Sequence, residues 1–216
     1  QNELNLTPTA KLNLNTGDII LRSTAIRSAH ITDLGTTIPS ANITYGSTGL
    51  FNIERYLQSI KSWRLLSTPI MQDGLSITNS WREAGSTVST GYGTQLTGPS
   101  PASTGMDETT GRGSMKWYNK AINNYVEILN TADQIARPQG YYVFVRGDRA
   151  QNIAGVGSAT NLRMRGRILT GDQTFSTLVS LGPTDGFESV GNPYASQINY
   201  RTRQQVFMEL EDLYSM

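Results

Sequence analysis

Few residues of this chain have the types and spacing that enzymatic chemistry requires. His30 is the single histidine, so a Ser-His-Asp triad or a histidine metal site would have to use it. The chain has no cysteine, which excludes disulfides, zinc-thiolate sites and thiol catalysis. No motif surrounds His30, and we interpret it as a partly exposed strand residue.

Carboxylate pairs are the second candidate, because two acids facing each other across a cleft can hydrolyse glycosidic bonds. Asp107 and Glu108 are adjacent within a Gly/Ser/Thr-rich stretch, while Asp73, Asp172 and Asp185 each stand beside a glycine. Turn aspartates commonly cap backbone N–H groups, so we favour a structural role and expect no catalytic residues and no metal site. A structural calcium ion stays open as an alternative, although no EF-hand spacing is present.

Two arginine motifs have a functional and a structural interpretation. Arg146-Gly147-Asp148 matches an integrin-ligand tripeptide, yet a Gly-Asp turn after a strand is the interpretation that we favour. Arg163, Arg165 and Arg167 form a one-sided row that predicts a solvated strand face. Because the net charge is only +1 and no aromatic residues alternate with these arginines, we expect no nucleic-acid partner.

Aromatic side chains are the best candidates for ligand binding. Tyr92, Trp117 and Tyr118 lie in or beside the loop-rich stretch, and they are our candidate ligand-binding residues for stacking on a sugar. Trp63 and Trp81 lie in alternating or ambiguous segments, where a tryptophan usually belongs to the core.

The element that must position these residues is the run Tyr141–Val145, which follows Gly140 and precedes a Gly147-Asp148 turn. Its residues favour β-structure, and both alternating faces are apolar. The pattern therefore predicts a central strand buried on both faces, including Tyr142 and Phe144.

Other segments predict mainly strands. Residues 114–118 and 125–129 suggest a hairpin, with a helix over 115–135 as the rival interpretation. Apolar residues at helical spacing predict a helix over 201–216. Further strands are expected at 11–15 and 19–23 around a Thr-Gly-Asp turn, and at 51–57, 62–70, 161–169 and 174–181.

These elements predict an all-β fold, an antiparallel β-sandwich or jelly roll with long loops and a short C-terminal helix. Charged residues make up 16% of the chain and hydrophobic residues 37%, and this low content of charged residues suits a loop-rich fold. We interpret residues 1–48 as an N-terminal β segment, the end of a repetitive stalk, and residues 49–216 as a β-sandwich domain truncated at its C-terminus. No apolar run is long enough to span a bilayer, so no membrane insertion is expected.

Five stretches in order resemble a β-rich domain of large secreted and cell-surface proteins of Bacteroidota, exported by the type IX secretion system. They are 52–56, 63–69, 140–149, 162–171 and 191–199, covering roughly residues 50 to 200. The chain departs from the family pattern at Asn199, where an acidic residue is usual, and it ends at Met216 without the usual further strands and sorting domain. The resemblance implies an extracellular or outer cell-surface location and a natural chain that continues past Met216.

Together these observations predict a non-catalytic structural or adhesion module of a bacterial surface or secreted protein. A carbohydrate-binding or accessory module is the alternative, and a glycoside hydrolase is a distant third. Expected partners are a surface polymer or glycan and other domains of the parent protein, and no cofactor is expected. Exposed near-parallel aromatic rings beside a groove would favour the binding module, and two facing carboxylates about 5–10 Å apart would favour the hydrolase.

Overall fold

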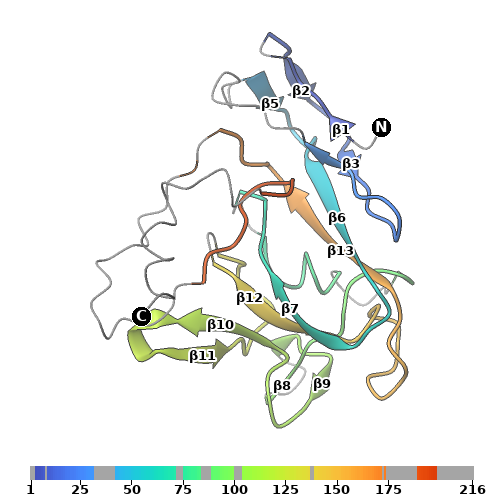
Figure 1. Ribbon diagram of the computed structural model, residues 1–216, viewed down its shortest axis with the longest axis vertical. Helices are drawn as coiled ribbons and strands as arrows, with labels where there is room; N and C mark the ends of the chain where they lie inside the picture. Colours follow the sequence, from blue (N-terminus) through green and yellow to red (C-terminus); the bar gives the residue numbers. More distant parts are fainter. Residues whose placement is uncertain are drawn as a thin grey trace, which may run out of the picture.

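A computed structural model describes most of the chain as an all-β protein, as predicted (Figure 1). The described residues include the 3-10 helix η3 (Lys120–Ile122). The predicted strand at 174–181 and the predicted helix at 201–216 lie outside the described residues. The structure describes residues 3–7, 9–31, 42–71, 75–83, 89–99, 104–136, 139–171, 173 and 189–198.

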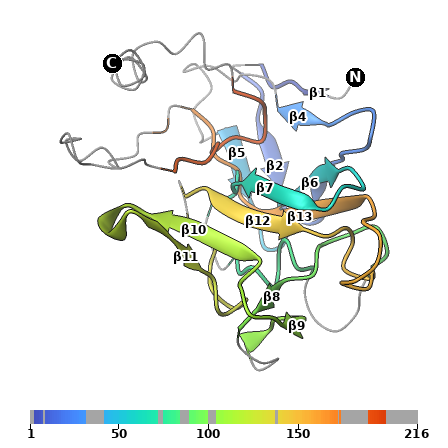
Figure 2. The same cartoon turned by 60° about the horizontal axis from the view of Figure 1, so that its bottom comes forward.

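A four-stranded antiparallel sheet forms one half of the molecule, with the strand order β11-β10-β12-β7 (Figure 2). The predicted central run becomes β12, which pairs with β10 on one side and β7 on the other. Strand β7 ends before Pro69, which cannot donate a hydrogen bond to a neighbouring strand. The strands are β7 (Ser62–Leu66), β10 (Met115–Asn119), β11 (Asn124–Glu127) and β12 (Tyr141–Val145).

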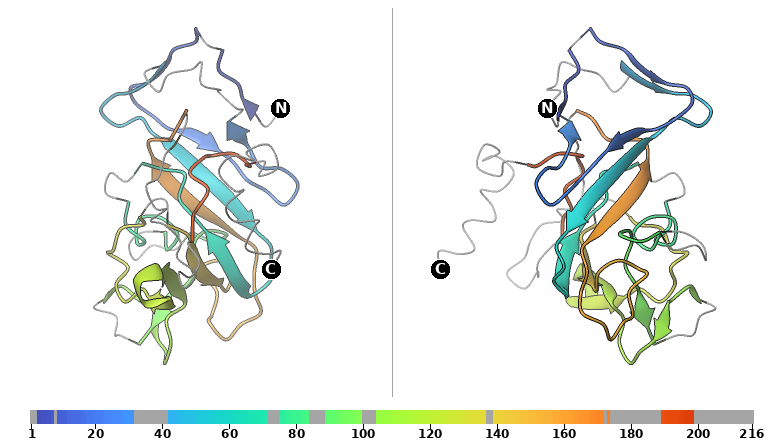
Figure 3. Two further views of the ribbon diagram at one scale, coloured as in Figure 1. Left: turned by 60° about the vertical axis from the view of Figure 1, so that its left-hand side comes forward. Right: turned by 90° about the vertical axis from the view of Figure 1, so that its right-hand side faces the viewer.

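A second sheet has the order β13-β6-β3, and the chain passes from it to the first sheet between β6 and β7 (Figure 3). β6 pairs antiparallel with β13 over its whole length and parallel with β3. These strands are β3 (Ile19–Leu21), β6 (Phe51–Leu57) and β13 (Thr160–Gly166).

Three short parallel pairs complete the described strands: β1 (Glu3–Leu4) with β4 (His30–Ile31), β2 (Leu12–Leu14) with β5 (Ile43–Tyr45), and β8 (Thr97–Gly98) with β9 (Glu108–Thr109). The strand-turn-strand pattern predicted near the N-terminus is confirmed. Its two strands do not pair with each other, however, because β2 pairs with β5 while β3 joins β6.

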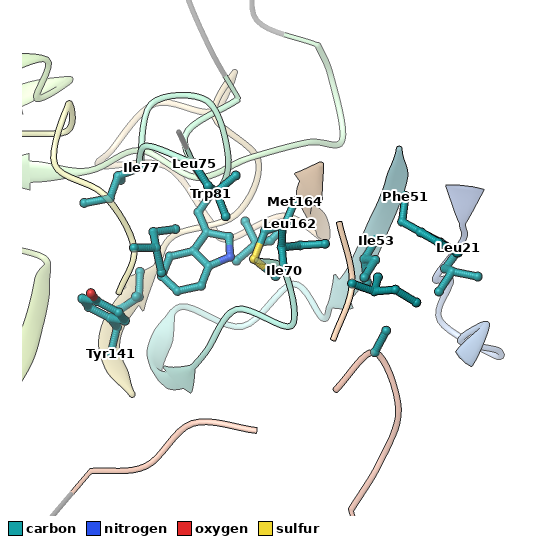
Figure 4. Packing of buried hydrophobic residues seen from close by; sticks show 14 of the residues in the cluster. Leu21, Phe51, Ile53, Ile70, Leu75, Ile77, Trp81, Tyr141, Leu162 and Met164 are labelled. Carbon is teal, nitrogen blue, oxygen red and sulfur yellow. The ribbon is translucent and has the colours of Figure 1, made fainter. Parts of the chain in front are cut away.

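The core runs continuously from the β3–β6 pair to the inner face of β12 (Figure 4). Trp81 is 1% exposed, and its ring meets the Tyr141 ring edge to face at 5.9 Å between centroids. Leu162 and Met164 on β13 lie within the same cluster. Burial of these large side chains supplies the main driving force for bringing the segments together.

The expectation that β12 is buried on both faces is wrong for Tyr142. Tyr141, Val143 and Val145 are at most 3% exposed, but Tyr142 is 38% exposed and Phe144 is only partly buried. Successive side chains of a strand point to opposite faces. The core therefore covers one face of β12, and the other face carries rings that remain accessible.

The hairpin prediction for residues 114–129 is confirmed, and the rival helix is wrong. β10 and β11 pair in register from Lys116–Glu127 to Asn119–Asn124, with η3 between them. Asn119 caps η3 by accepting a hydrogen bond from Ala121 N, and Asn123 ends it with φ at 49°. Asparagine tolerates this left-handed conformation, which explains why the turn forms at this pair of asparagines.

Candidate functional site

Aromatic rings from all four strands line the outer side of the four-stranded sheet. We call this surface the aromatic face, and it consists of Trp63 on β7, Tyr118 on β10, Tyr125 on β11, and Tyr142 and Phe144 on β12. Trp63, Tyr125 and Tyr142 are 40%, 51% and 38% exposed. Large aromatic residues gathered on one accessible surface are typical of binding sites rather than of an ordinary solvated sheet.

Ring contacts connect the aromatic face from one end to the other. The rings of Trp63 and Tyr142 are stacked at 5.5 Å and 21°, and Trp63 meets Phe144 edge to face at 5.4 Å. Tyr125 lies 5.7 Å from Tyr142 at 40°, and Tyr118 lies 5.6 Å from Tyr125 at 68°. Each such contact restrains the orientation of both rings, so the face is preorganised for a ligand.

Strand register places these rings together. Trp63 stands directly opposite Phe144, and Tyr118 stands opposite Tyr125. Directly opposite residues in an antiparallel pair project from the same face. Tyr142 lies diagonally across from Trp63, which is within reach of aromatic side chains.

One ion pair borders the exposed rings. Lys116, which stands opposite Tyr142, has its Nζ 3.4 Å from Glu127 Oε1 and 5.6 Å from the centre of the Trp63 ring. Glu127 also accepts a hydrogen bond from Gly113 N. The pair contributes no net charge, and its oxygen and nitrogen atoms can bond to ligand hydroxyl groups.

At the other end, the Arg146 guanidinium lies over the Phe144 ring, 4.8 Å from its centre. It donates to Thr97 Oγ1 at 3.3 Å and to Gln95 O at 3.5 Å. Burial lowers the pKa of Arg146, and the carboxylate of Glu108 acts in the opposite direction. Arg146 thus holds Phe144 in place while its own donors are used by the protein.

A pocket of about 220 Å³ opens beside the aromatic face. Leu65 on β7 is 63% exposed, stands opposite Tyr142 and also lines this pocket. Leu65 is therefore the lining residue that neighbours the aromatic face, whose five rings do not themselves line the pocket.

The structure places the candidate residue Tyr92 away from the aromatic face. The Arg163 guanidinium covers its ring at 3.8 Å from the centre and is held there by hydrogen bonds to both carboxylate oxygens of Glu83. The Glu83 hydrogen bond raises the pKa of Arg163. Because its ring is covered by a fixed cation, Tyr92 serves as an internal contact in this structure.

The other two candidates, Trp117 and Tyr118, lie on opposite sides of β10. Trp117 points inward and packs against the hydrophobic core. Tyr118 belongs to the aromatic face, but it is only 8% exposed and its hydroxyl bonds to Asn123. Of the three candidates, Tyr118 is therefore the one that the structure places in the aromatic face, where it is buried and supports the Tyr125 ring.

Asp107, the first of the two adjacent candidate acids, is held by contacts within the protein. Asp107 binds both Arg82 and Arg149 at 3.0 Å and accepts a hydrogen bond from Leu96 N. Its carboxylate therefore joins three parts of the chain, while its neighbour Glu108 is exposed on β9. The turn acids Asp73, Asp172 and Asp185 lie outside the described residues.

The structural interpretation of Arg146-Gly147-Asp148 is confirmed. Asp148 is 4% exposed and accepts hydrogen bonds from the backbone N–H groups of Gly91 and Ala150. Gly147 adopts a φ of 119°, and a Cβ there would meet Ser158 N at 2.5 Å. The tripeptide is a buried turn, and its aspartate is not accessible to a receptor.

The arginine row on β13 and after it is only partly a solvated face, because each arginine engages the protein. Arg163 binds Glu83, Arg165 binds Asp18 at 2.6 Å, and the Arg167 guanidinium lies 5.5 Å from the centre of the Tyr45 ring. The arginines therefore fasten neighbouring segments to the sheet.

His30 is a partly exposed strand residue, as predicted, with its Nε2 3.6 Å from Glu3 Oε1. Over the described ranges, no three His, Asp or Glu side chains gather as metal ligands do, and calcium binding stays a prediction. In the same part of the chain, no helix has the length and apolar character needed to cross a bilayer.

Sequence reasoning missed Trp63, Tyr142 and Tyr125. Their strands were predicted, but an apolar run with two apolar faces gives no indication of which face is covered. Trp63 and Leu65 share one face of β7, and Tyr142 and Phe144 share one face of β12. These four residues would have identified the aromatic face if the register of β7 against β12 had been known. Register depends on contacts between distant segments and cannot be read from either segment alone.

Comparison with known proteins adds no assignment. No family model, curated protein or solved structure matches this chain. The function must therefore be argued from the aromatic face and its surroundings.

Proposed function

We propose that this protein is a non-catalytic adhesion module of a secreted or cell-surface bacterial protein, and that its aromatic face holds a glycan or another surface polymer. The stacked, accessible pair Trp63 and Tyr142 is the observation that carries this proposal. The extracellular location rests on the resemblance of residues 50–200 to domains exported by the type IX secretion system.

Ring chemistry supports a sugar as the ligand. The C–H groups on the face of a sugar ring are weakly positive, whereas the face of an aromatic ring is negative, so the two attract when stacked. Sugar hydroxyls need polar partners nearby, and Lys116 and Glu127 supply a donor and an acceptor at the edge of the rings. A purely structural module would need no preorganised row of accessible rings.

Docking of another domain of the parent protein is the second candidate function. The same enrichment in Trp and Tyr occurs at protein interfaces. The nearby pocket and the Lys116–Glu127 ion pair at the edge of the rings favour a polymer chain as the ligand. Self-association is tested together with ligand binding.

Binding to an array of polysaccharides, followed by calorimetric titration of the best ligand, tests the proposal. Trp63→Ala and Tyr142→Ala should each weaken binding at least about tenfold, since each removes a stacking surface. Ile26→Ala is the matched control, because Ile26 is 89% exposed and lies off the face, and it should bind as the unmodified protein does.

Three results would overturn the proposal. The first is the absence of polysaccharide binding, and the second is binding that survives both aromatic substitutions. The third is turnover of a bound polysaccharide, which would show an enzyme. Sedimentation of the same variants shows whether Trp63→Ala dissolves a dimer instead, in which case the face docks a second copy.

A further inference from the structure

The pocket beside the aromatic face lies where the two sheets meet, with walls from β6, β7 and β13. The walls are largely apolar, formed among others by Leu57, Leu66, Leu162 and Met164. At about 220 Å³ the pocket is smaller than the roughly 300–1,000 Å³ that is usual for drug-sized ligands. It therefore suits one small group rather than a chain segment.

Arg55 is the charged residue in these walls. It lies on β6 opposite Leu162 and, by strand alternation, on the same face as the core residue Ile53. Burial lowers the pKa of Arg55. A guanidinium nevertheless remains charged in proteins, so this strand places a positive charge among apolar side chains.

Nothing in the described part of the chain neutralises Arg55. None of the ion pairs found there includes it, and its side chain makes no hydrogen bond. An uncompensated cation that is largely removed from water costs free energy. Arg82, Arg149 and Arg163, by contrast, each have a carboxylate partner.

The remaining polar groups of the pocket are used internally. Ser67 Oγ donates to Asn192 O at 3.1 Å, and Asn192 Nδ2 donates to Ser196 O at 2.7 Å. The Tyr194 hydroxyl donates to Gly171 O at 2.9 Å. These bonds fix the rim of the pocket and leave the Arg55 guanidinium as the group that can receive a ligand.

We infer that the pocket binds a carboxylate carried by the ligand, with Arg55 as its partner and an acidic sugar as the ligand class. A guanidinium fork matches the two oxygens of a carboxylate. Leu65 lines the pocket and stands opposite Tyr142, so a polymer lying on the aromatic face can reach the pocket with one substituent. The sugar rests on the proposed function, whereas carboxylate binding rests on Arg55 and the pocket.

Titration with oligogalacturonate and with its methyl ester tests this inference, because esterification removes the carboxylate charge and leaves the sugar backbone unchanged. The unmodified protein should bind the acid at least about tenfold more tightly than the ester, as expected for a charge-assisted pair. Arg55→Met should abolish that preference, and Arg55→Lys should keep part of it. Lys11→Met is the matched control, because it removes a positive charge from an exposed residue outside the aromatic face and the pocket, and it should keep the preference.

Thermal unfolding separates a binding role from a structural one. If the Arg55 charge is kept for a ligand, Arg55→Met should leave the midpoint temperature unchanged or raise it, since it removes an unpaired, partly buried charge. A lower midpoint for Arg55→Met, or an acid preference that survives this substitution, would overturn the inference.

D-Glucuronate, with D-glucose as the neutral control, distinguishes failure of this inference from failure of the proposed function. If D-glucuronate alone raises the midpoint of the unmodified protein but not that of Arg55→Met, the carboxylate pocket stands even when no polysaccharide binds. If neutral polysaccharides bind through Trp63 and Arg55→Met changes nothing, the proposed function stands and the carboxylate pocket fails.

Discussion

The rings of Trp63 and Tyr142 lie 5.5 Å apart and within 21° of parallel on the accessible side of the four-stranded sheet. They come from different strands, and each is more than a third exposed. Their contact makes the outer side of this sheet an ordered surface and gives the first of four predictions.

A double-mutant cycle on Trp63→Ala and Tyr142→Ala should show a coupling free energy of about 0.5–1.5 kcal/mol, because the two rings stack on each other. Urea unfolding of the two single variants and the double variant measures it. A cycle of Trp63→Ala with Ile26→Ala is the control and should show additive effects. Additivity in the Trp63–Tyr142 cycle would mean that the rings do not interact in solution.

Trp81→Ala should lower the free energy of unfolding by about 3–5 kcal/mol, because Trp81 is 1% exposed and its removal leaves a cavity against Tyr141. Trp63→Ala removes the same side chain from an exposed site and should cost about 1–2 kcal/mol. Denaturant unfolding of both variants makes the comparison. Equal losses would contradict the placement of Trp63 at the surface.

Asp107→Asn should lower the free energy of unfolding by about 3–5 kcal/mol, because it leaves Arg82 and Arg149 without their shared carboxylate in a largely buried site. Asp18→Asn is the matched control. Its partner Arg165 is 47% exposed in its side chain, so the loss should be about 1 kcal/mol or less. A larger loss of stability for Asp18→Asn than for Asp107→Asn would show that the exposed ion pair contributes more than the buried one, contrary to this prediction.

Stability should fall in alkaline solution because of Tyr141. Burial raises the pKa of the Tyr141 hydroxyl, so above about pH 10 the unfolded chain loses this proton while the folded chain keeps it. The stability that the protonated Tyr141 hydroxyl contributes is complete below the pKa of this tyrosine in the unfolded chain. It is lost as the pH rises through the pKa of Tyr141 in the folded protein. Urea unfolding from pH 9 upward measures the slope, which Tyr141→Phe should reduce. An unchanged slope in Tyr141→Phe would mean that other groups cause the alkaline loss of stability. Tyr45 would be the first of these, because burial also raises its pKa.

Strand positions were predictable because alternation and turn residues are local signals. The hairpin around Asn123 and the strand Phe51–Leu57 were expected and are present. The exposed side of β12 was not, because Tyr142 and Val143 look equally suited to a core and only the assembled sheets determine which is covered. For the same reason, Tyr92 looked accessible in sequence although Arg163, from a distant strand, covers its ring.

The pairing of β6 with β13 also bears on how the chain reaches this state. Arg55 and Leu162 are neighbours across this ladder but lie about a hundred residues apart in sequence, so their encounter closes a long loop at a large entropic cost. The β10–β11 hairpin needs only the short η3 connection and can form within microseconds. The carboxylate pocket, whose walls include both β6 and β13, is thus completed only when the longest-range strand pairing among the described residues has formed.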